Sequence, residues 1–356
     1  MLRQAKQRAQ TFCDDYGLDL PILMAPMAGA CPPALAAAVM KAGGMGACGA
    51  LLMGPEAVAQ WAADVRTTQA GPFQLNLWVP DQKPARDRAH ETRVADFLAQ
   101  WGPRPSEISA DIPVSFADQC NALIEARPAV VSSIMGIFPP EVVAQLKAKG
   151  IRWFATATTV AEALAAEEAG ADAIVAQGSE AGGHRGAFDA QNAAAQTIGL
   201  VSLVPAICDA VKVPVIATGG IADARGVLAA LALGASAVQI GTALLRTPEA
   251  AIPASWADAI GRARPEDTAV TRAFSGRLGR SLRTDYVTAA EAADAPDPLP
   301  YPLQRSATGP MRAAGTQDND IARLQAWAGQ SAALAQAAPA EDVVRNLWAE
   351  VKATLG

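Results

Sequence analysis

The stretch Val213–Leu245, VPVIATGGIADARGVLAALALGASAVQIGTALL, contains one complete strand–helix–strand unit. Its two ends, Val213–Gly220 and Ala237–Leu245, are continuous apolar runs, and an amphipathic segment, Asp223–Leu233, lies between them and closes on Gly234. Continuous rather than alternating apolar runs are typical of parallel strands buried on both faces. The stretch therefore predicts two parallel strands connected by a helix.

The same unit recurs along the chain. Six further apolar runs precede it: Pro21–Pro26, Gly44–Ala50, Phe73–Val79, Ala129–Met135, Arg152–Ala157 and Ala173–Gly178. Amphipathic segments separate the runs: Pro33–Ala42, Pro55–Ala70, Ala117–Ala126, Pro140–Ala148, Thr159–Ala169 and Ile198–Val211. Eight strand–helix units predict an α/β fold of the (β/α)8 TIM-barrel type. An open doubly wound sheet is the alternative, but the turn after the first run, MAGACPP (Met27–Pro33), lacks its G-x-G-x-x-G signature.

Two stretches interrupt this rhythm. Residues 80–113 are polar, contain prolines and include one helical segment, Asp87–Trp101, and residues 248–319 contain eight prolines. We expect them to form a smaller, mainly helical cap or substrate domain over the barrel mouth. Residues 1–79, 114–247 and 320–356 would then form the barrel domain, with a helical tail that packs back on it.

Composition excludes several classes of protein. The 356 residues carry a formal net charge of −6, so no global attraction to nucleic acid is expected. No uninterrupted apolar run reaches the length of about 18 residues that a membrane span needs. The N-terminus shows no secretory signal, and the five cysteines show no metal-binding or disulfide spacing. These features predict a cytoplasmic protein that binds neither nucleic acid nor membrane.

The carboxyl ends of the strands are where a barrel of this type builds its active site. In this chain they are mostly small or amide-bearing, without a His, Cys, Asp and Glu cluster for a metal and without a Ser-His-Asp arrangement. TGGI (Thr218–Ile221) and QIGT (Gln239–Thr242) end the last two strands, where glycine amides and the Thr242 hydroxyl can bind a phosphate. The alternative is that Gly219 and Gly220 only permit a tight turn.

The loop AQGSEAGGHRG (Ala176–Gly186) contains four glycines and one of the two histidines of the chain. Glycines allow the loop to pass close to a ligand, and histidine is the usual residue for proton transfer near neutral pH. We therefore take His184 as the candidate catalytic residue; a structural histidine that satisfies a loop carbonyl is the alternative. His90 lies in a polar helical stretch and is expected to be solvated.

These motifs resemble the nitronate monooxygenase family (2-nitropropane dioxygenase-like), class I branch, over nearly the whole chain. The resemblance rests on PILMAPMAGA, LAAAVMKAGGMGACGA, AQGSEAGGHRG, ATGGIADARGVLAALALGASAVQIGTALL, TRAFSGR, YPLQ and WAGQ. It implies a barrel enzyme that binds FMN non-covalently and oxidises alkyl nitronates, notably propionate 3-nitronate, with O2 through a flavin semiquinone. The implied products are an aldehyde and nitrite or nitrate, and neither a metal nor NAD(P)H is required.

The resemblance also implies roles for individual residues. His184 matches the catalytic histidine, and Tyr301 matches an aromatic residue near the substrate. Residues that match FMN contacts, together with the second phosphate-site glycine, are Ala25, Pro26, Met27, Asn76, Gln177, Gly182, Gly219, Gly220, Gln239, Ile240, Gly241 and Thr242. A carboxylate on the substrate would need a cation, for which Arg305 and Arg185 are candidates. Trp78 and Met135 are expected to shape the cavity wall, and Cys31 is expected to be a small buried side chain, although a reactive thiol is the alternative.

Rival functions remain open at this point. A flavin-dependent enoyl-acyl-carrier-protein reductase or a quinone reductase would share the barrel and use NADH. A phosphosugar isomerase or synthase would use the phosphate site without a flavin, and a flavin-binding sensor would not need His184. A monomer and a homodimer are both compatible with the sequence.

Overall fold

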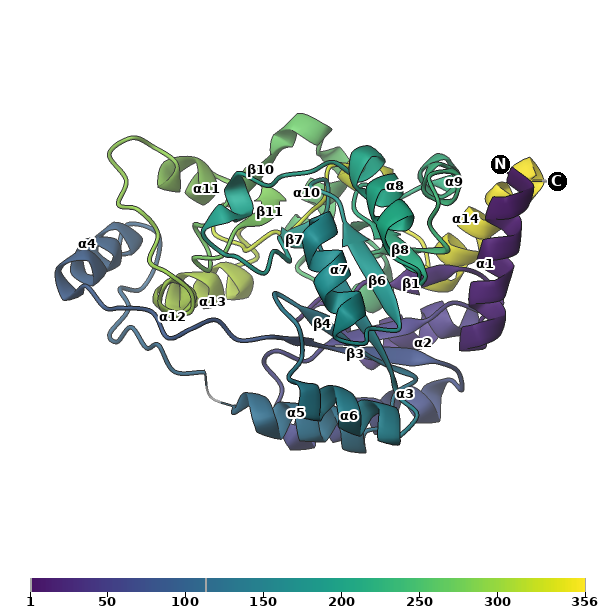
Figure 1. Cartoon of the computed structure of the whole chain (residues 1–356). Coiled ribbons are helices and arrows are strands. Elements are labelled where there is room, and N and C mark those ends of the chain that lie inside the picture. The colour runs from purple at the N-terminus through teal and green to yellow at the C-terminus, as the bar shows by residue number, and fades with distance from the viewer. Residues whose placement is uncertain (1, 113, 356) are drawn as a thin grey trace.

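The structure is a computed structural model that describes residues 2–112 and 114–355. Eight parallel strands form a barrel at its centre (Figure 1). They are β1 (Ile22–Met24), β2 (Gly46–Gly49), β3 (Phe73–Trp78), β4 (Val130–Ile134), β5 (Arg152–Ala157), β6 (Ala173–Gln177), β8 (Val215–Thr218) and β9 (Ala237–Ile240). Each strand lies within one of the eight predicted runs. The TIM-barrel prediction is therefore confirmed, and the doubly wound alternative is wrong.

The strand order is β1-β9-β8-β6-β5-β4-β3-β2, and every pair is parallel. An isolated parallel bridge between Leu23 and Met45 brings the β2 end of the sheet back to β1, which nearly closes the barrel. Because all strands are parallel, their carboxyl ends meet at one rim, where the candidate site residues lie.

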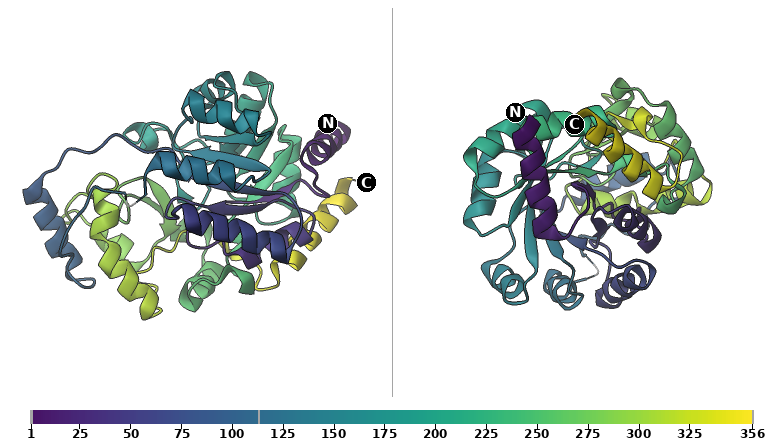
Figure 2. Two further views of the ribbon diagram at one scale, coloured as in Figure 1. Left: turned by 90° about the horizontal axis from the view of Figure 1, so that it is seen from below. Right: turned by 90° about the vertical axis from the view of Figure 1, so that its right-hand side faces the viewer.

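Helices surround the barrel, and their ends follow local sequence signals (Figure 2). They are α2 (Pro33–Lys41), α3 (Pro55–Thr68), α5 (Phe116–Glu125), α6 (Pro140–Ala148), α7 (Val160–Glu168), α8 (Leu200–Ala210) and α9 (Ala224–Ala232). Proline occupies the first turn of α2, α3 and α6, where its missing N–H leaves no bond unmade. A reciprocal capping box joins Thr159 to Glu162 at the start of α7.

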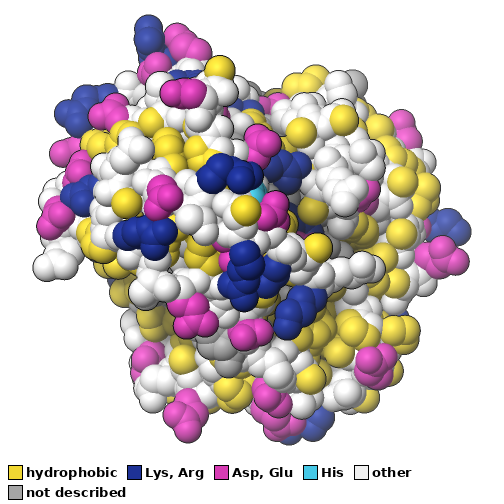
Figure 3. All heavy atoms as spheres, turned by 90° about the vertical axis from the view of Figure 1, so that its left-hand side faces the viewer, with side chains coloured by type: hydrophobic (Ala, Val, Ile, Leu, Met, Phe, Trp, Pro, Cys, Tyr) yellow, Lys and Arg dark blue, Asp and Glu magenta, His cyan; other side chains and the backbone are white. Residues whose placement is uncertain are grey.

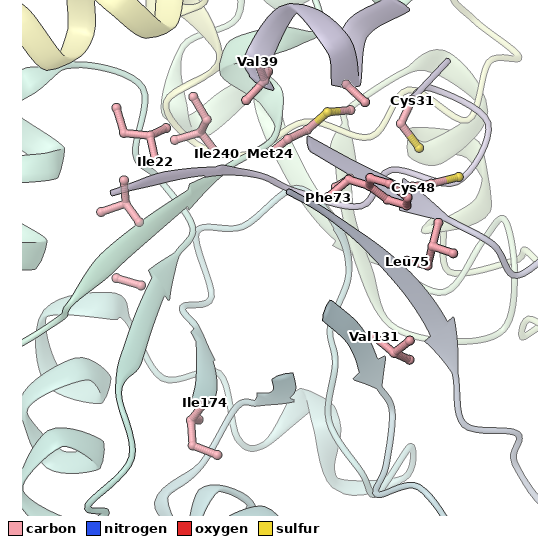
Figure 4. Packing of buried hydrophobic residues seen from close by; sticks show 14 of the residues in the cluster. Ile22, Met24, Cys31, Val39, Cys48, Phe73, Leu75, Val131, Ile174 and Ile240 are labelled. Atoms are coloured by element: carbon pink, nitrogen blue, oxygen red, sulfur yellow. The ribbon is translucent and has the colours of Figure 1, made fainter. Parts of the chain in front are cut away.

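The main core lies between the strands and this ring of helices. Figure 4 shows Ile22, Met24 and Ile240 on the strands beside Val39 of α2, and all four side chains are essentially inaccessible to solvent. Burial of one such side chain contributes about 1.5–3 kcal/mol. The core is thus built from the apolar runs that identify the strands in the sequence.

A helix that the sequence analysis did not predict covers the other end of the barrel. α1 (Leu2–Tyr16) places Phe12, Cys13 and Tyr16 against Phe154 of β5, with ring centroids 6.3 Å apart for Phe12 and 5.1 Å for Tyr16. The C-terminal helix α14 (Ala340–Leu355) packs on α1, α2 and α9, so the two chain ends lie side by side (Figure 1).

The two interrupting stretches pack on each other beyond the barrel mouth. The first contributes α4 (Arg88–Leu98); the second contributes α10 (Ala254–Arg262), α11 (Asp285–Ala290), α12 (Leu303–Ala307) and α13 (Gly309–Gln317). A separate core joins them, made of side chains such as Val94, Leu98, Phe274, Tyr286 and Met311. The division into two domains stays a prediction, and Met1, Pro113 and Gly356 lie outside the described residues.

A small sheet ties the second stretch to the barrel. β10 (Thr268–Thr271) pairs antiparallel with β11 (Gly279–Leu282), and β11 pairs with β7 (Gly183–His184) from the loop after β6. The cap thus contains strands as well as the expected helices. Its sheet holds the His184 loop in place.

The expected helical tail is only partly correct. α14 is helical, but residues 320–339 are mainly irregular and cross the barrel mouth, with one short 3-10 helix, η5 (Ala332–Leu334). The other short 3-10 helices are η1 (Asn192–Ala194), η2 (Thr242–Leu244), η3 (Pro248–Ala250) and η4 (Pro265–Asp267). The crossing segment therefore belongs to the wall of the site rather than to the outer ring of helices.

The surface offers no block of one charge on the face shown in Figure 3, where basic and acidic side chains are interspersed with hydrophobic ones. Within the described residues, no helix combines the length and apolar character needed to cross a bilayer.

Candidate active site

A cavity of about 530 Å³ lies at the carboxyl ends of the barrel strands. His184 and Arg305 line it, and Ile240 does not: its side chain is buried in the core, and its carbonyl accepts the N–H of Ala25 at 2.8 Å. The other predicted cofactor residues all line this one cavity: Ala25, Pro26, Met27, Asn76, Gln177, Gly182, Gly219, Gly220, Gln239, Gly241 and Thr242.

Gly219 and Gly220 form a cradle at one end of the cavity. Their φ angles are 120° and 66°, a region that residues with a Cβ rarely adopt, and a Cβ on Gly219 would lie 3.0 Å from the amide nitrogen of Ala181. Among the described residues, neither glycine amide has a hydrogen-bond acceptor. The turn therefore requires glycine for its backbone, and it also leaves two N–H groups free, as a phosphate site would need.

The hydroxyl of Thr242 completes this end of the cavity. Its oxygen accepts the N–H of Gly329 at 3.0 Å, which leaves its proton available to a ligand. Ser331 donates to the carbonyl of Gly220 at 2.7 Å and so fixes the turn from the opposite side. Both Gly329 and Ser331 belong to the segment that crosses the barrel mouth.

The three predicted amide side chains differ in what they leave free. Asn76 donates to the Ser132 carbonyl at 3.2 Å, and Gln239 accepts from Gln74 at 3.1 Å. The side-chain oxygen of Asn76 and the NH2 group of Gln239 have no partner within the described residues. Gln177 instead donates to the His184 carbonyl at 3.0 Å and accepts from the Gly186 amide at 2.7 Å. Asn76 and Gln239 thus offer one acceptor and one donor to a ligand, whereas Gln177 holds the histidine loop.

His184 is fixed on several sides. Its backbone belongs to β7, its Nε2 lies 2.8 Å from the Ser275 hydroxyl, and its ring contacts Trp78 and Trp327 with centroids 4.8 and 4.9 Å away. Ser275 is fully buried. Because Nε2 is engaged by Ser275, Nδ1 is the ring nitrogen available to a ligand, and Ser275 can accept from or donate to Nε2 to suit either tautomer.

The imidazole of His184 is neutral. Burial, together with the charges of Arg277, Arg305 and Arg312, lowers its pKa from 6.5 to about 3. A neutral imidazole leaves a hydrogen-bonding or weakly basic group in the cavity.

Two of these arginines line the cavity, and neither has an ion partner in the part of the chain that the structure describes. Arg312 donates to the Gln325 side chain at 3.1 Å and to the Arg305 carbonyl at 2.9 Å, and burial lowers its pKa to about 10. The guanidinium of Arg305 makes no hydrogen bond or ion pair within the described residues. Arg277 lies behind the wall, where it pairs with Asp81. The cavity is therefore cationic and suited to an anionic ligand.

Three candidates from the sequence lie outside this cavity. Arg185 is buried and donates to backbone carbonyls, including that of Gln196 at 3.0 Å, so it stabilises a loop. Tyr301 is also buried and stacks on the far side of Trp78. Cys31 is a small buried side chain, as expected, and donates to the Met27 carbonyl at 2.9 Å. Trp78 and Met135 line the cavity as predicted.

No group of three or more His, Cys, Asp or Glu side chains suited to a metal occurs among residues 2–112 and 114–355. The donor set of the cavity instead combines free amides at a glycine turn, an unpaired carbonyl, an unpaired NH2 group and cations. This set fits an organic ligand that carries a phosphate.

Comparison with known proteins gives the family. The family model described as nitronate monooxygenase matches residues 12–350. The chain belongs to the nitronate monooxygenase family. It is 41% identical to the nitronate monooxygenase of Pseudomonas aeruginosa, with 94% of this chain and 97% of the relative covered. It is 39% identical to that of Paraburkholderia phytofirmans, with 95% and 94% covered. The chain is therefore an oxidoreductase enzyme.

Solved structures agree with the family assignment. A nitroalkane oxidase from Streptomyces ansochromogenes superposes with a TM-score of 0.86 at 34% identity, covering 97% of this chain and all (100%) of the other. FabK from Thermotoga maritima gives 0.75 at 29% identity, covering 97% and 96%. The barrel and the crossing segment are thus shared over essentially the full chain.

Three residues of the site in this member of the nitronate monooxygenase family could not be recognised from the sequence: Ser275, Arg312 and Ser331. Ser275 lies inside the recognised TRAFSGR segment, and Ser331 directly follows WAGQ, so adjacency to a motif was the available signal. Arg312 lies on α13, in a stretch without any motif, and only the packing of that helix brings it to the cavity.

Proposed function

We propose that the chain catalyses the FMN-dependent oxidation of alkyl nitronates by O2 to an aldehyde and nitrite or nitrate, with propionate 3-nitronate as the preferred substrate. The observation that carries the proposal is that one cavity combines the Gly219–Gly220 cradle, the His184 ring and the unpaired Arg305 guanidinium. Family membership supports the reaction class.

FMN fits the residues present. The free amides of Gly219 and Gly220 and the hydroxyl of Thr242 would hold the phosphate, and Asn76 and Gln239 would bind the polar edge of the ring system. The chemistry that FMN supplies when bound is acceptance of electrons from the nitronate and reaction with O2.

The task of His184 depends on the protonation state of the substrate. A nitronate is already an anion, so no carbon proton has to be removed, and His184 can donate from Nδ1 to a nitro oxygen while Ser275 donates to Nε2. For a neutral nitroalkane the tautomer reverses, and Nδ1 becomes the base. Trp78 and Trp327 flank the ring and exclude water from this hydrogen bond.

Arg305 gives the cavity its preference for a second negative charge. A substrate with a carboxylate would supply the ion partner that this guanidinium lacks among the described residues. Propionate 3-nitronate carries such a group, whereas simple alkyl nitronates do not.

The deciding experiment is anaerobic mixing of the purified protein, loaded with FMN, with propionate 3-nitronate and separately with NADH. We expect the flavin absorbance to change with the nitronate and to stay constant with NADH. Rapid bleaching by NADH alone would instead make the chain an NADH-dependent reductase.

A further inference from the structure

A second cavity, of about 310 Å³, lies beside the first. Two residues, Leu51 and Trp78, line both cavities. The lining of the second cavity includes the apolar side chains of Ile112, Val114, Phe116 and Tyr301, and also polar ones, among them Gln82 and Gln119. Its rim is charged, with Lys83 and Asp111 3.8 Å apart and both exposed. The second cavity therefore offers an apolar surface that an alkyl chain could contact, beside polar side chains.

A thin aromatic wall separates the two cavities. Trp78 and Tyr301 stack with ring centroids 4.6 Å apart and planes 15° apart, and Met135 completes their cluster. One face of this wall meets His184, whose ring centroid is 4.8 Å from that of Trp78. A group bound beside His184 therefore lies one side chain away from the second cavity.

Two features of this wall are energetically unfavourable. The indole N–H of Trp78 is buried with no hydrogen-bond partner among the described residues, which opposes this packing. Met135 has a φ of 71°, a left-handed conformation that is unfavourable for a residue with a side chain. Such local strain concentrates at ligand-binding sites.

We propose that the stacked Trp78–Tyr301 pair sets the length of chain that the enzyme accepts, because it keeps the second cavity from serving as an alkyl-chain subsite. This inference rests on the proposed function. A chain that extends from the nitronate carbon past His184 meets Trp78, whose indole is backed by Tyr301 on the side of the second cavity. Without the Tyr301 ring behind it, the indole can move into the second cavity and open a passage between the two cavities. The native wall thus restricts the enzyme to short nitronates.

The test compares straight-chain primary nitronates of increasing length in the native enzyme and in Tyr301→Ala. In the native enzyme, kcat/KM should stop rising once the chain reaches the wall. In Tyr301→Ala it should keep rising, by about fourfold for each further buried methylene. The matched control is Tyr301→Phe, which keeps the ring, so its chain-length profile should equal the native profile.

A second substitution tests whether the chain occupies the second cavity. Ala110 lines that cavity and is absent from the first, so Ala110→Phe in the Tyr301→Ala background should abolish the gain for long nitronates and leave short ones unchanged. Calorimetric Kd values of linear nitroalkanes should depend on chain length in the same way in each of these proteins, which provides a readout without turnover. Should Tyr301→Ala not fold, Tyr301→Leu serves the same purpose.

Each outcome is decisive. An unchanged ratio of long to short nitronates in Tyr301→Ala overturns the subsite. An equal loss for all chain lengths in Tyr301→Phe shows that the hydroxyl contacts the substrate and also overturns it. A native enzyme that turns over no nitronate refutes the proposed function, whereas the nitroalkane Kd series still tests the subsite.

Discussion

Substitution of Arg305 by methionine tests whether the cationic cavity selects a substrate carboxylate. Methionine keeps an unbranched apolar stem and removes only the guanidinium. The native Arg305 side chain lines the cavity, and its guanidinium has no ion partner within the described residues, so it is available to the substrate. At about 4 Å and an effective dielectric constant of about 20, a full charge pair is worth roughly 4 kcal/mol before desolvation.

Desolvation removes part of that energy. A hydrogen bond to a charged group retains about 1.5–3 kcal/mol, which corresponds to about 10- to 150-fold in kcat/KM. Arg305 is partly exposed, so we expect the lower end, about tenfold, for propionate 3-nitronate. Ethyl nitronate, which has no carboxylate, should change by less than about twofold, because no charge pair is lost.

The assay is steady-state turnover of both nitronates by the native enzyme, Arg305→Met and Arg104→Met. Arg104 is a matched control, because it lies in the same cap, pairs with Asp96 and is about half exposed (52%). Equal losses for the two nitronates in Arg305→Met would refute the reasoning, since they would show that the arginine acts on the nitronate group or on folding. No loss for either would show that the guanidinium does not reach the substrate.

Three further predictions concern the remaining parts of the site. His184→Asn should lower nitronate turnover by about 10²–10⁴-fold with FMN retained. Its unfolding free energy should also fall less steeply with acid than that of the native enzyme, because between pH 6.5 and about 3 His184 takes up a proton only when the native enzyme unfolds. Denaturant unfolding at several pH values measures this slope, and an unchanged slope contradicts the low pKa. Ser275→Ala should lower kcat by about 10- to 100-fold with little change in KM, because it frees the imidazole that Ser275 holds at 2.8 Å, and an unaltered kcat would exclude a positioning role. Gly219→Ala should release FMN on gel filtration, because its Cβ would approach the Ala181 amide to 3.0 Å. Gly17→Ala, at a φ of 67° in open space, controls for backbone strain. Equal FMN retention in the two variants would argue against the cradle.

The barrel could be predicted because its strands depend on local composition. Buried parallel strands need continuous apolar side chains, and runs such as Ala173–Gly178 or Arg152–Ala157 are bounded by glycine or by helix caps. α1 escaped prediction because its sequence is mostly polar, and only the packing of Phe12 and Tyr16 against Phe154 reveals its buried face. Residues 320–339 also escaped prediction, because contacts with the barrel mouth set their conformation.

The site residues also divide into those that short motifs identify and those that only the packing of the chain identifies. Glycines and His184 could be assigned because turns near a ligand require specific residue types, and these types occur together in short motifs. The cations could not be assigned as reliably. Arg185 is adjacent to His184 in sequence but binds loop carbonyls, whereas Arg312, more than a hundred residues away, lines the cavity. Adjacency in sequence does not show into which space a long side chain extends.

The low pKa of His184 and the cationic cavity are two consequences of one arrangement. Arg277, Arg305 and Arg312 oppose a proton on the imidazole, and the same charges attract an anion. A bound nitronate offsets their field, so it should raise the pKa of His184, and by linkage a proton on His184 should strengthen nitronate binding. The profile of kcat/KM against pH reports the free enzyme and should show no ionisation of His184 above pH 5, whereas the kcat profile reports the complex and should show one closer to neutrality. A single acid limb near pH 6.5 in both profiles, absent in His184→Asn, would mean that the arginines do not reach the imidazole and that its environment is open to water.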